Sequence, residues 1–277
     1  MHTVAILGAG DLGGALARTL AEGDAVSRVL LIDKARDVAA GKALDIRQSG
    51  PIGGFDTIVE GTGDVQAAAA ADVLVVADEH AAGEWTGDAA VQLLQRVAGL
   101  APRAPIVFAG AGQRLVMALA LGELRISPVR LIGSAPAAAA AAVRALAAPA
   151  LDASPSDVAV PVLGVPPRWV VAWTLATAAG APADGIAPFE SARVERLLAA
   201  SWPPGPYSLA SAAAMVIRAA LTSSRRRACC FVPVPLQSRH SVIAAAPVIL
   251  GPAGIVEVRM PELAPRERVA LESALFT

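Results

Sequence analysis

Gly8-Ala9-Gly10-Asp11-Leu12-Gly13 is the stretch of sequence that decides the fold of the first half of this 277-residue chain. It follows an apolar, strand-like run at residues 4–7 and opens a segment in which leucines recur every four residues, as on one face of a helix. In this context the first glycine permits a tight turn, the second lets a pyrophosphate approach the backbone, and the third allows close helix packing. We therefore predict a dinucleotide-binding turn, with Gly8, Gly10, Asp11, Leu12 and Gly13 as cofactor-binding residues.

An acidic residue lies at the offset that this motif requires. Twenty residues after Gly13, a second apolar run at residues 29–32 ends in Asp33. Its carboxylate is suited to accept hydrogen bonds from an adenosine ribose and would repel a 2′-phosphate, which favours NAD over NADP. Lys34 and Arg36 weaken that preference, and a glycine turn that serves only packing is the alternative. Asp33 joins the predicted cofactor-binding residues.

The surrounding pattern predicts the fold class. Apolar runs at residues 57–60, 73–76 and 106–109 alternate with helical stretches at 37–48 and 88–101, and wholly apolar strands are typical of parallel sheets covered on both faces. We predict a doubly wound parallel sheet of the Rossmann type over residues 1–133. A smaller α+β, substrate-type domain is predicted over residues 134–277, with helices at 134–150, 189–201, 208–221 and 265–275 and strands at 158–164, 169–173, 228–233, 241–249 and 255–259.

The composition limits the classes of partner. Hydrophobic residues make up 55% of the chain, the formal charge is −1 and only 4% of residues are aromatic, so nucleic acid is not an expected partner. The mean hydropathy is +0.55, but the longest apolar runs are too short to span a membrane. No basic segment precedes an apolar one at the start, so we expect a cytoplasmic protein and no membrane partner. The adjacent Cys229 and Cys230 are interpreted as buried small hydrophobes.

Several stretches of the sequence carry a family resemblance. The first part contains VAILGAGDLGGALARTLA from residue 4, followed by VLLIDKARDVAAGKALDIRQSGP from residue 29; ADVLVV, VRLIGS and PVILGPAGIVEVRMPELAPRERVALESA begin at residues 71, 129 and 247. Together they resemble the lactate/malate dehydrogenase family. The resemblance implies a Rossmann fold, hydride transfer between NAD and a small 2-hydroxy or 2-oxo acid, and a homo-oligomer, either a dimer or a tetramer. In that family a histidine acts as the acid/base, an aspartate orients it, and arginines hold the substrate.

The catalytic positions of the family depart from its pattern. Pro166 stands at the position of the histidine, and Ala139 and Ala142 stand at those of the aspartate and an arginine. The segment at residues 78–91, which corresponds to the mobile lid, contains no arginine. Proline cannot transfer a proton, so we assign no catalytic residue and expect no turnover of malate or lactate.

The end of the fourth predicted strand also departs from the family. Where the family has small residues, Ala77 is followed by Asp78 and Glu79, whose charges oppose a pyrophosphate unless they point to solvent or meet a cation. NAD is therefore predicted as a possible cofactor only. His80 and His240 are weighed as replacement bases and interpreted as loop residues, and no metal site is predicted. The function hypotheses are a silent NAD-binding family member, an active oxidoreductase with a rearranged site, and a nucleotide-binding structural or regulatory homologue.

Overall fold

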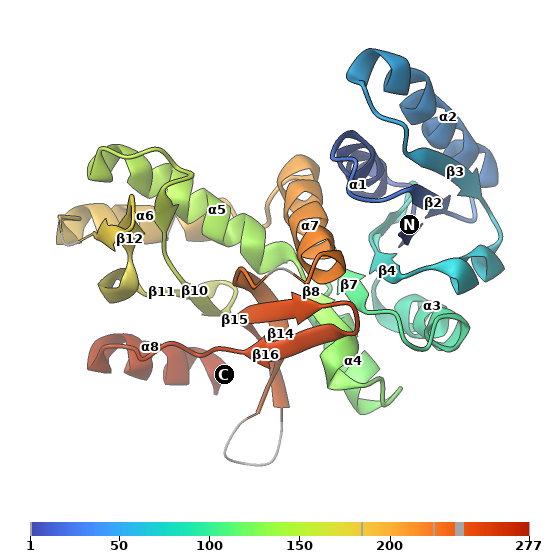
Figure 1. Ribbon diagram of the computed structural model, residues 1–277. Helices are drawn as coiled ribbons and strands as arrows, with labels where there is room; N and C mark the ends of the chain where they lie inside the picture. The colour runs from blue at the N-terminus through green and yellow to red at the C-terminus, as the bar shows by residue number, and fades with distance from the viewer. Residues whose placement is uncertain (1, 184, 224, 236–240, 277) are drawn as a thin grey trace.

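The first half of the chain forms a parallel sheet. In the computed structural model, which describes residues 2–183, 185–223, 225–235 and 241–276, the strand order is β8-β7-β4-β1-β2-β3, and all neighbours in this run are parallel (Figure 1). This arrangement confirms the predicted fold class. The strands are β1 (Thr3–Leu7), β2 (Arg28–Ile32), β3 (Ile58–Thr62), β4 (Val73–Val76), β7 (Ile106–Phe108) and β8 (Leu131–Gly133).

Helices connect these strands and cover the sheet. The leucines predicted to form one helical face, Leu12, Leu16 and Leu20, are all buried. The second helix continues past the predicted end at residue 48 and stops where Gly54 adopts a left-handed conformation, with φ of 74°, as glycines at helix C-termini commonly do. The helices are α1 (Asp11–Glu22), α2 (Arg36–Gly53), α3 (Gly87–Leu100) and α4 (Arg114–Gly122), the last of which was not predicted.

The second half extends the same sheet with antiparallel strands. Phe231 of β14 pairs with Gly133 of β8, and the sheet continues through β15 and β10 to β11, with β16 paired to β15. The predicted boundary between residues 133 and 134 falls between β8 and the next helix. The strands are β10 (Val162–Val165), β11 (Arg168–Val171), β14 (Ala228–Pro235), β15 (Ser241–Gly251) and β16 (Gly254–Val258); β9 (Val158–Ala159), β12 (Thr177–Ala178) and β13 (Ala181–Pro182) form a small separate sheet.

Helix α7 joins the two halves, because it packs against α1 on one side and α5 on the other.

Cys229 and Cys230 lie on β14 as free thiols, as expected, and burial raises the pKa of Cys229 to about 12. Among the described residues, no helix is long and apolar enough to cross a membrane. The helices of this half are α5 (Ala135–Ala147), α6 (Pro188–Ala200), α7 (Pro206–Leu221) and α8 (Pro265–Leu275), and short 3-10 turns lie at Val65–Ala70, Pro128–Arg130, Ala148–Leu151 and Trp173–Leu175.

Candidate functional site

The candidate site lies where the central strands β1 and β4 end. These strands are neighbours, and the chain leaves β1 for β2 through α1 but leaves β4 for β7 through α3. Ligands of doubly wound sheets bind outside the carboxyl ends of such a strand pair. The predicted turn lies at this point, with Gly8 at φ of 117° and α1 starting at Asp11. The fold therefore brings the five predicted turn residues to the place expected for a ligand.

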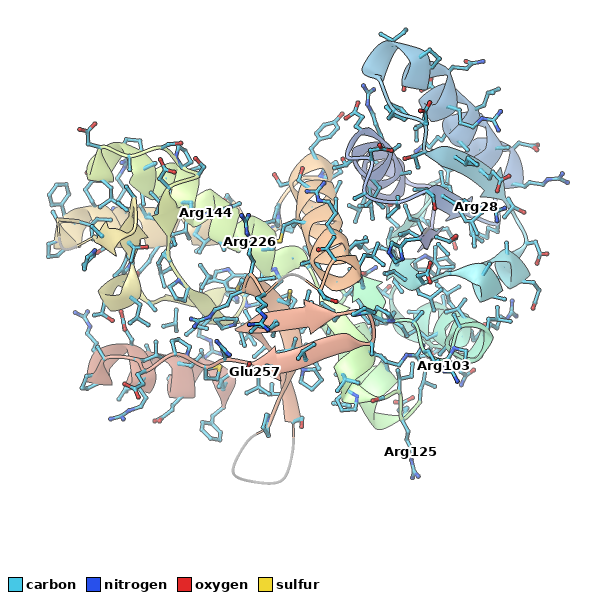
Figure 2. All side chains as sticks on the ribbon, viewed as in Figure 1. Arg28, Arg103, Arg125, Arg144, Arg226 and Glu257 are labelled. Carbon is cyan, nitrogen blue, oxygen red and sulfur yellow. The ribbon has the colours of Figure 1, made fainter. Side chains whose placement is uncertain are left out.

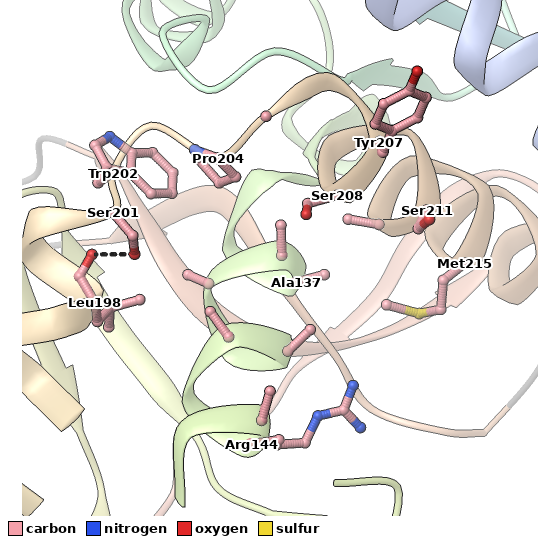
Figure 3. A pocket seen from close by; sticks show the side chains of 17 residues that line it. Ala137, Arg144, Leu198, Ser201, Trp202, Pro204, Tyr207, Ser208, Ser211 and Met215 are labelled. Atoms are coloured by element: carbon pink, nitrogen blue, oxygen red, sulfur yellow. Dashed lines mark hydrogen bonds between the residues drawn. The ribbon is translucent and has the colours of Figure 1, made fainter.

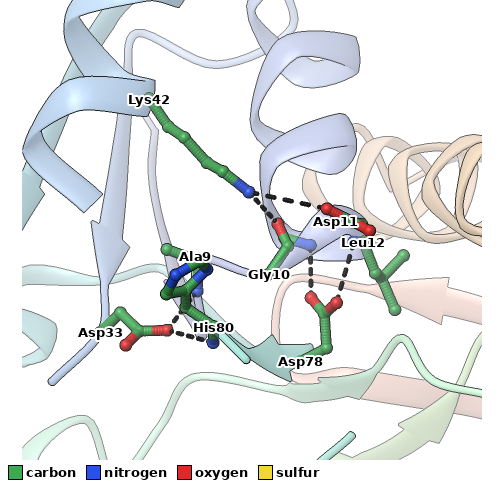
Figure 4. Close-up of polar contacts among 9 residues, drawn as sticks. Ala9, Gly10, Asp11, Leu12, Asp33, Lys42, Asp78 and His80 are labelled. Atoms are coloured by element: carbon green, nitrogen blue, oxygen red, sulfur yellow. Dashed lines mark hydrogen bonds and ion pairs between the residues drawn. The ribbon is translucent and has the colours of Figure 1, made fainter. Parts of the chain in front are cut away.

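A short hairpin follows β4 directly and lies over this turn (Figure 4). Its strands are β5 (Asp78–Glu79) and β6 (Gly83–Glu84), which pair antiparallel. The backbone oxygen of Asp78 accepts the N–H of Gly10 at 2.9 Å. The Asp78 carboxylate accepts the N–H groups of Leu12 at 3.1 Å and Gly13 at 2.7 Å. One residue of the hairpin thus binds three backbone donors of the predicted dinucleotide turn.

The glycines of the turn are required by this contact. A Cβ atom on Gly8 would collide with the backbone of Asp78, and one on Gly10 would collide with the Asp78 carboxylate. A Cβ atom on Gly13 would collide with the backbone oxygen of Gly8, as expected where helix and strand approach closely. The open space that glycines leave beside the turn is thus occupied by Asp78.

Asp33 is buried and fully engaged by backbone donors. One carboxylate oxygen accepts the N–H of Ala9 at 2.7 Å and that of His80 at 2.9 Å, and the other accepts the N–H of Ala35 at 2.9 Å. The residue is only 2% exposed. Burial opposes the charge, but the hydrogen bonds from Ala9, His80 and Ala35 outweigh it and lower the pKa of Asp33 below its usual value.

Two lysines bind acceptors here: Lys34 binds the hairpin, and Lys42 binds the glycine turn. Glu79 is buried and forms an ion pair with Lys34, whose pKa is raised by the hydrogen bond to Glu79. The ammonium of Lys42 donates to the backbone oxygen of Gly10 at 2.7 Å and lies 4.0 Å from the carboxylate of Asp11. Of the two acids expected to need a cation or solvent, Glu79 therefore meets a cation. Asp78 instead meets the N-terminus of α1.

The far end of the hairpin is anchored in the same way. The two carboxylate oxygens of Glu84 accept the N–H groups of Ala111 and Gly112, both at 2.8 Å, in the loop after β7. The indole N–H of Trp85 donates to the backbone oxygen of Leu7 at 3.1 Å, at the end of β1. Sequence analysis missed Glu84 and Trp85 because these contacts join segments far apart in the chain.

The arrangement described does not fit a bound dinucleotide. A pyrophosphate at the start of α1 would need the N–H groups of Leu12 and Gly13, and both already donate to Asp78. A ribose at Asp33 would have to share a carboxylate that already accepts three backbone N–H groups. The fold thus brings the predicted cofactor-binding residues together. However, the N–H groups of Leu12 and Gly13 and the carboxylate of Asp33 already have hydrogen-bond partners within the chain.

A cavity of about 640 Å³ lies elsewhere, between α5, the link from α6 to α7, and α7 (Figure 3). Alanine is the residue that lines it most often, including Ala139 and Ala142. Arg144 is the positively charged residue that lines this cavity. Figure 2 shows Arg144 in the second half of the molecule, away from Arg28 of β2. No carboxylate or imidazole is among the described residues that line the cavity, so it offers no aspartate, glutamate or histidine for proton transfer.

Pro166, which stands at the position of the family's catalytic histidine, lies in a turn. Pro166 and Pro167 connect β10 to β11, where Val165 pairs with Arg168. His80 contributes its backbone N–H to Asp33, His2 lies 3.9 Å from Asp72 at the opposite edge of the sheet, and His240 lies outside the described residues. Within the described ranges no group of three acidic, histidine or cysteine side chains is placed to hold a metal ion.

A doubly wound parallel sheet with a glycine turn at its central strand pair defines a nucleotide-binding fold of the Rossmann type. Comparison with known proteins gives the family. The chain is 30% identical to the malate dehydrogenase of Thermomicrobium roseum over 97% of its own length and 93% of the relative's, and 28% identical to that of Chlorobium phaeobacteroides over 97% and 94%. The chain therefore belongs to the lactate/malate dehydrogenase family.

Solved structures agree on the fold. A malate dehydrogenase from Salinibacter ruber superposes with a TM-score of 0.85 at 24% identity, covering 98% of this chain and 93% of the other. A lactate dehydrogenase from Cryptosporidium parvum, solved with lactic acid and nicotinamide adenine dinucleotide, superposes with a TM-score of 0.87 at 19% identity, covering 99% and 95%. No family model matches the chain. Family membership supports NAD as a possible cofactor, although the hairpin contacts described above do not fit it.

Proposed function

We propose that this chain is a member of the lactate/malate dehydrogenase family that has lost hydride transfer on malate and lactate. The observation that carries the proposal is the turn at Pro166 and Pro167, which by the resemblance replaces the catalytic histidine. A proton must leave the substrate hydroxyl as hydride departs, and proline offers no acceptor. General acid–base catalysis contributes on the order of 10²–10⁴ in rate, so its loss alone is severe.

The rest of the catalytic set supports the same conclusion. Ala139 and Ala142 offer neither the carboxylate that orients a histidine nor the guanidinium that binds a substrate carboxylate. The lid segment at residues 78–91 contains no arginine and forms the hairpin with its acidic side chains bound internally. The remaining role is that of a structural or regulatory protein in the cytoplasm. It would act as a homo-oligomer, dimer or tetramer, or through a small organic acid that it binds without turnover, because the contacts of Asp78 with Leu12 and Gly13 oppose the dinucleotide that the sequence predicts.

The test is an initial-rate assay with NAD and malate or lactate, followed by NADH absorbance. The malate dehydrogenase of Thermomicrobium roseum serves as the positive control under identical conditions. We expect a rate indistinguishable from the blank, and no rescue by Pro166→His, because Ala139 supplies no orienting carboxylate. Turnover of either acid above about 1 s⁻¹ would overturn the proposal. Light scattering after size exclusion tests the oligomer.

The alternative is an active oxidoreductase that uses another substrate with a rearranged site. It requires a side chain that can exchange a proton within reach of a cofactor. Of the histidines that the structure describes, His80 belongs to the segment beside the turn, since its backbone N–H binds Asp33. An assay of NAD reduction across small alcohols and 2-hydroxy acids separates the two, because activity abolished by His80→Gln would favour the alternative.

A further inference from the structure

We infer that the hairpin β5–β6 is a built-in ligand: it holds the Asp78 carboxylate at the start of α1 in place of a dinucleotide pyrophosphate. This inference concerns binding, so it stands whether or not the proposed loss of turnover holds. It gives a reason for Gly8 and Gly10 in a chain whose catalytic positions depart from the family pattern. The glycines are needed for the chain's own contact.

The first support is the match between the Asp78 carboxylate and an anion site. Helix α1 is 12 residues long, and the N–H groups of its first turn carry partial positive charge that favours an anion. The two oxygens of Asp78 accept two of these groups, from Leu12 and Gly13, in the arrangement that a phosphate would adopt. A second anion cannot share these donors without facing the first.

The second support is steric and independent of charge. The backbone oxygen of Asp78 binds the N–H of Gly10, and the positions where Cβ atoms of Gly8 and Gly10 would lie are filled by Asp78. In a dinucleotide-binding turn this space admits the ligand. Here Asp78 occupies that space, so its carboxylate must move before an anion can reach the N–H groups of Leu12 and Gly13.

The third support is that the hairpin also seals Asp33. Its His80 N–H donates to the carboxylate oxygen that Ala9 also binds, and the other oxygen is bound by Ala35. A ribose hydroxyl would have to share this carboxylate with three backbone donors. Asp78 at the phosphate position and His80 at the ribose position thus belong to one short segment.

The hairpin is fixed at its other end, so its removal breaks several contacts together. Glu84 binds Ala111 and Gly112 through both carboxylate oxygens, and Trp85 binds Leu7. Glu79 is paired with Lys34 between the two ends. Of the hairpin's contacts, only those to Leu12 and Gly13 depend on the Asp78 carboxylate, so removing that carboxylate frees the two anion-binding N–H groups while the other anchors stay in place.

The experiment compares the native protein with Asp78→Ala by titration calorimetry with NAD. The native protein is expected to show no binding up to about 1 mM, and Asp78→Ala a gain of at least about tenfold in affinity. The matched control is Asp72→Asn, which removes a carboxylate that binds the N–H of Thr3 at the opposite end of β4. This control is expected to behave as the native protein does.

Sodium pyrophosphate is the second probe, because it tests the anion position without the rest of a dinucleotide. It should raise the melting temperature of Asp78→Ala above that in sodium chloride of equal ionic strength, and leave the native protein unchanged. Native binding of NAD below about 100 µM, or a folded Asp78→Ala that gains affinity for neither probe, overturns the inference.

If Asp78→Ala does not fold, hydrogen exchange on the native protein tests whether Asp78 occupies the glycine turn. The amides of Gly10, Leu12 and Gly13 should be protected without any nucleotide, and millimolar NAD should leave their exchange unchanged. Rapid exchange of these amides, or protection that appears only with NAD, overturns the inference.

Discussion

The crevice at β1 and β4 and the cavity between α5 and α7 are two hollows of one fold that differ in what holds their walls. In the crevice, the carboxylates of Asp33, Asp78 and Glu84 bind backbone donors, and a cavity of about 330 Å³ remains beside them. The cavity of about 640 Å³ between the helices is lined mostly by alanines and serines, with Arg144 as its charged group. The crevice should therefore be sensitive to substitution of its carboxylates, and the cavity tolerant of larger side chains.

Asp33→Ala should have the largest effect and tests whether the crevice is held by its carboxylates. Three backbone N–H groups lose their acceptor in a buried place, at about 1–3 kcal/mol for an unsatisfied buried donor, so we expect a loss of about 3–4 kcal/mol. Urea denaturation measures it. The control is Asp64→Ala, an exposed cap of a 3-10 turn, with a loss of about 1 kcal/mol or less. Equal losses would contradict the comparison.

Gly10→Ala tests the steric part of the comparison. The new Cβ collides with the Asp78 carboxylate and displaces it from Leu12 and Gly13, so we expect a loss of about 2 kcal/mol. Gly99→Ala is the matched control, because nothing lies within 4 Å of a Cβ at that position of α3. Alanine there should be neutral or stabilise by up to about 1 kcal/mol. A neutral Gly10→Ala would mean that Asp78 is not held against the turn.

The pH dependence of unfolding sharpens the role of Asp33. Its pKa is lower in the folded state than the value of about 3.9 in an unfolded chain. Its contribution is therefore complete above about pH 4 and is lost as the pH falls through the folded-state pKa. Urea midpoints from pH 6 to pH 3 should fall more steeply for the native protein than for Asp33→Asn. Parallel curves would exclude this contribution.

Ala142→Leu should have the smallest effect and tests the tolerance of the cavity. Ala142 lines the space between α5 and α7, so a longer apolar side chain has room and should change stability by less than about 1 kcal/mol. Ala17→Leu provides the contrast, because Ala17 is fully buried on α1 beside the crevice. Overpacking there should cost about 1–3 kcal/mol. Similar melting temperatures for the two variants would remove the distinction.

Local sequence was sufficient to predict helices and strands that have a clear apolar run or a recognisable helix start. The apolar run Val73–Val76 was predicted at its exact bounds, as was Pro265–Leu275 with proline in its first turn. Helix α2 extends beyond its prediction although Pro51 removes one N–H from its last turn, because Gly54 closes the helix by donating to the backbone oxygen of Gly50. Helix α4 was not predicted, because an almost continuously apolar stretch gives no helical period.

The hairpin could not be predicted from its own residues. Its strands are two residues long and contain Asp, Glu and Gly, which are rare in strands. They are held by donors of α1 and of the loop after β7, far away in the sequence. The signal that was available was the pair of acids directly after β4, beside a turn that attracts anions. It indicated that an anion would meet this turn, but not that the chain would supply it.

The attachment of Asp78 to β4 has a consequence for how the fold responds to its surroundings. A protein that binds a free ligand gains stability with the logarithm of that ligand's concentration. A carboxylate that follows Val76 after a single residue is never diluted, and its local concentration is set by the covalent chain. If Asp78 takes the place of the pyrophosphate, the stability of the folded state should therefore not depend on the concentration of nucleotides.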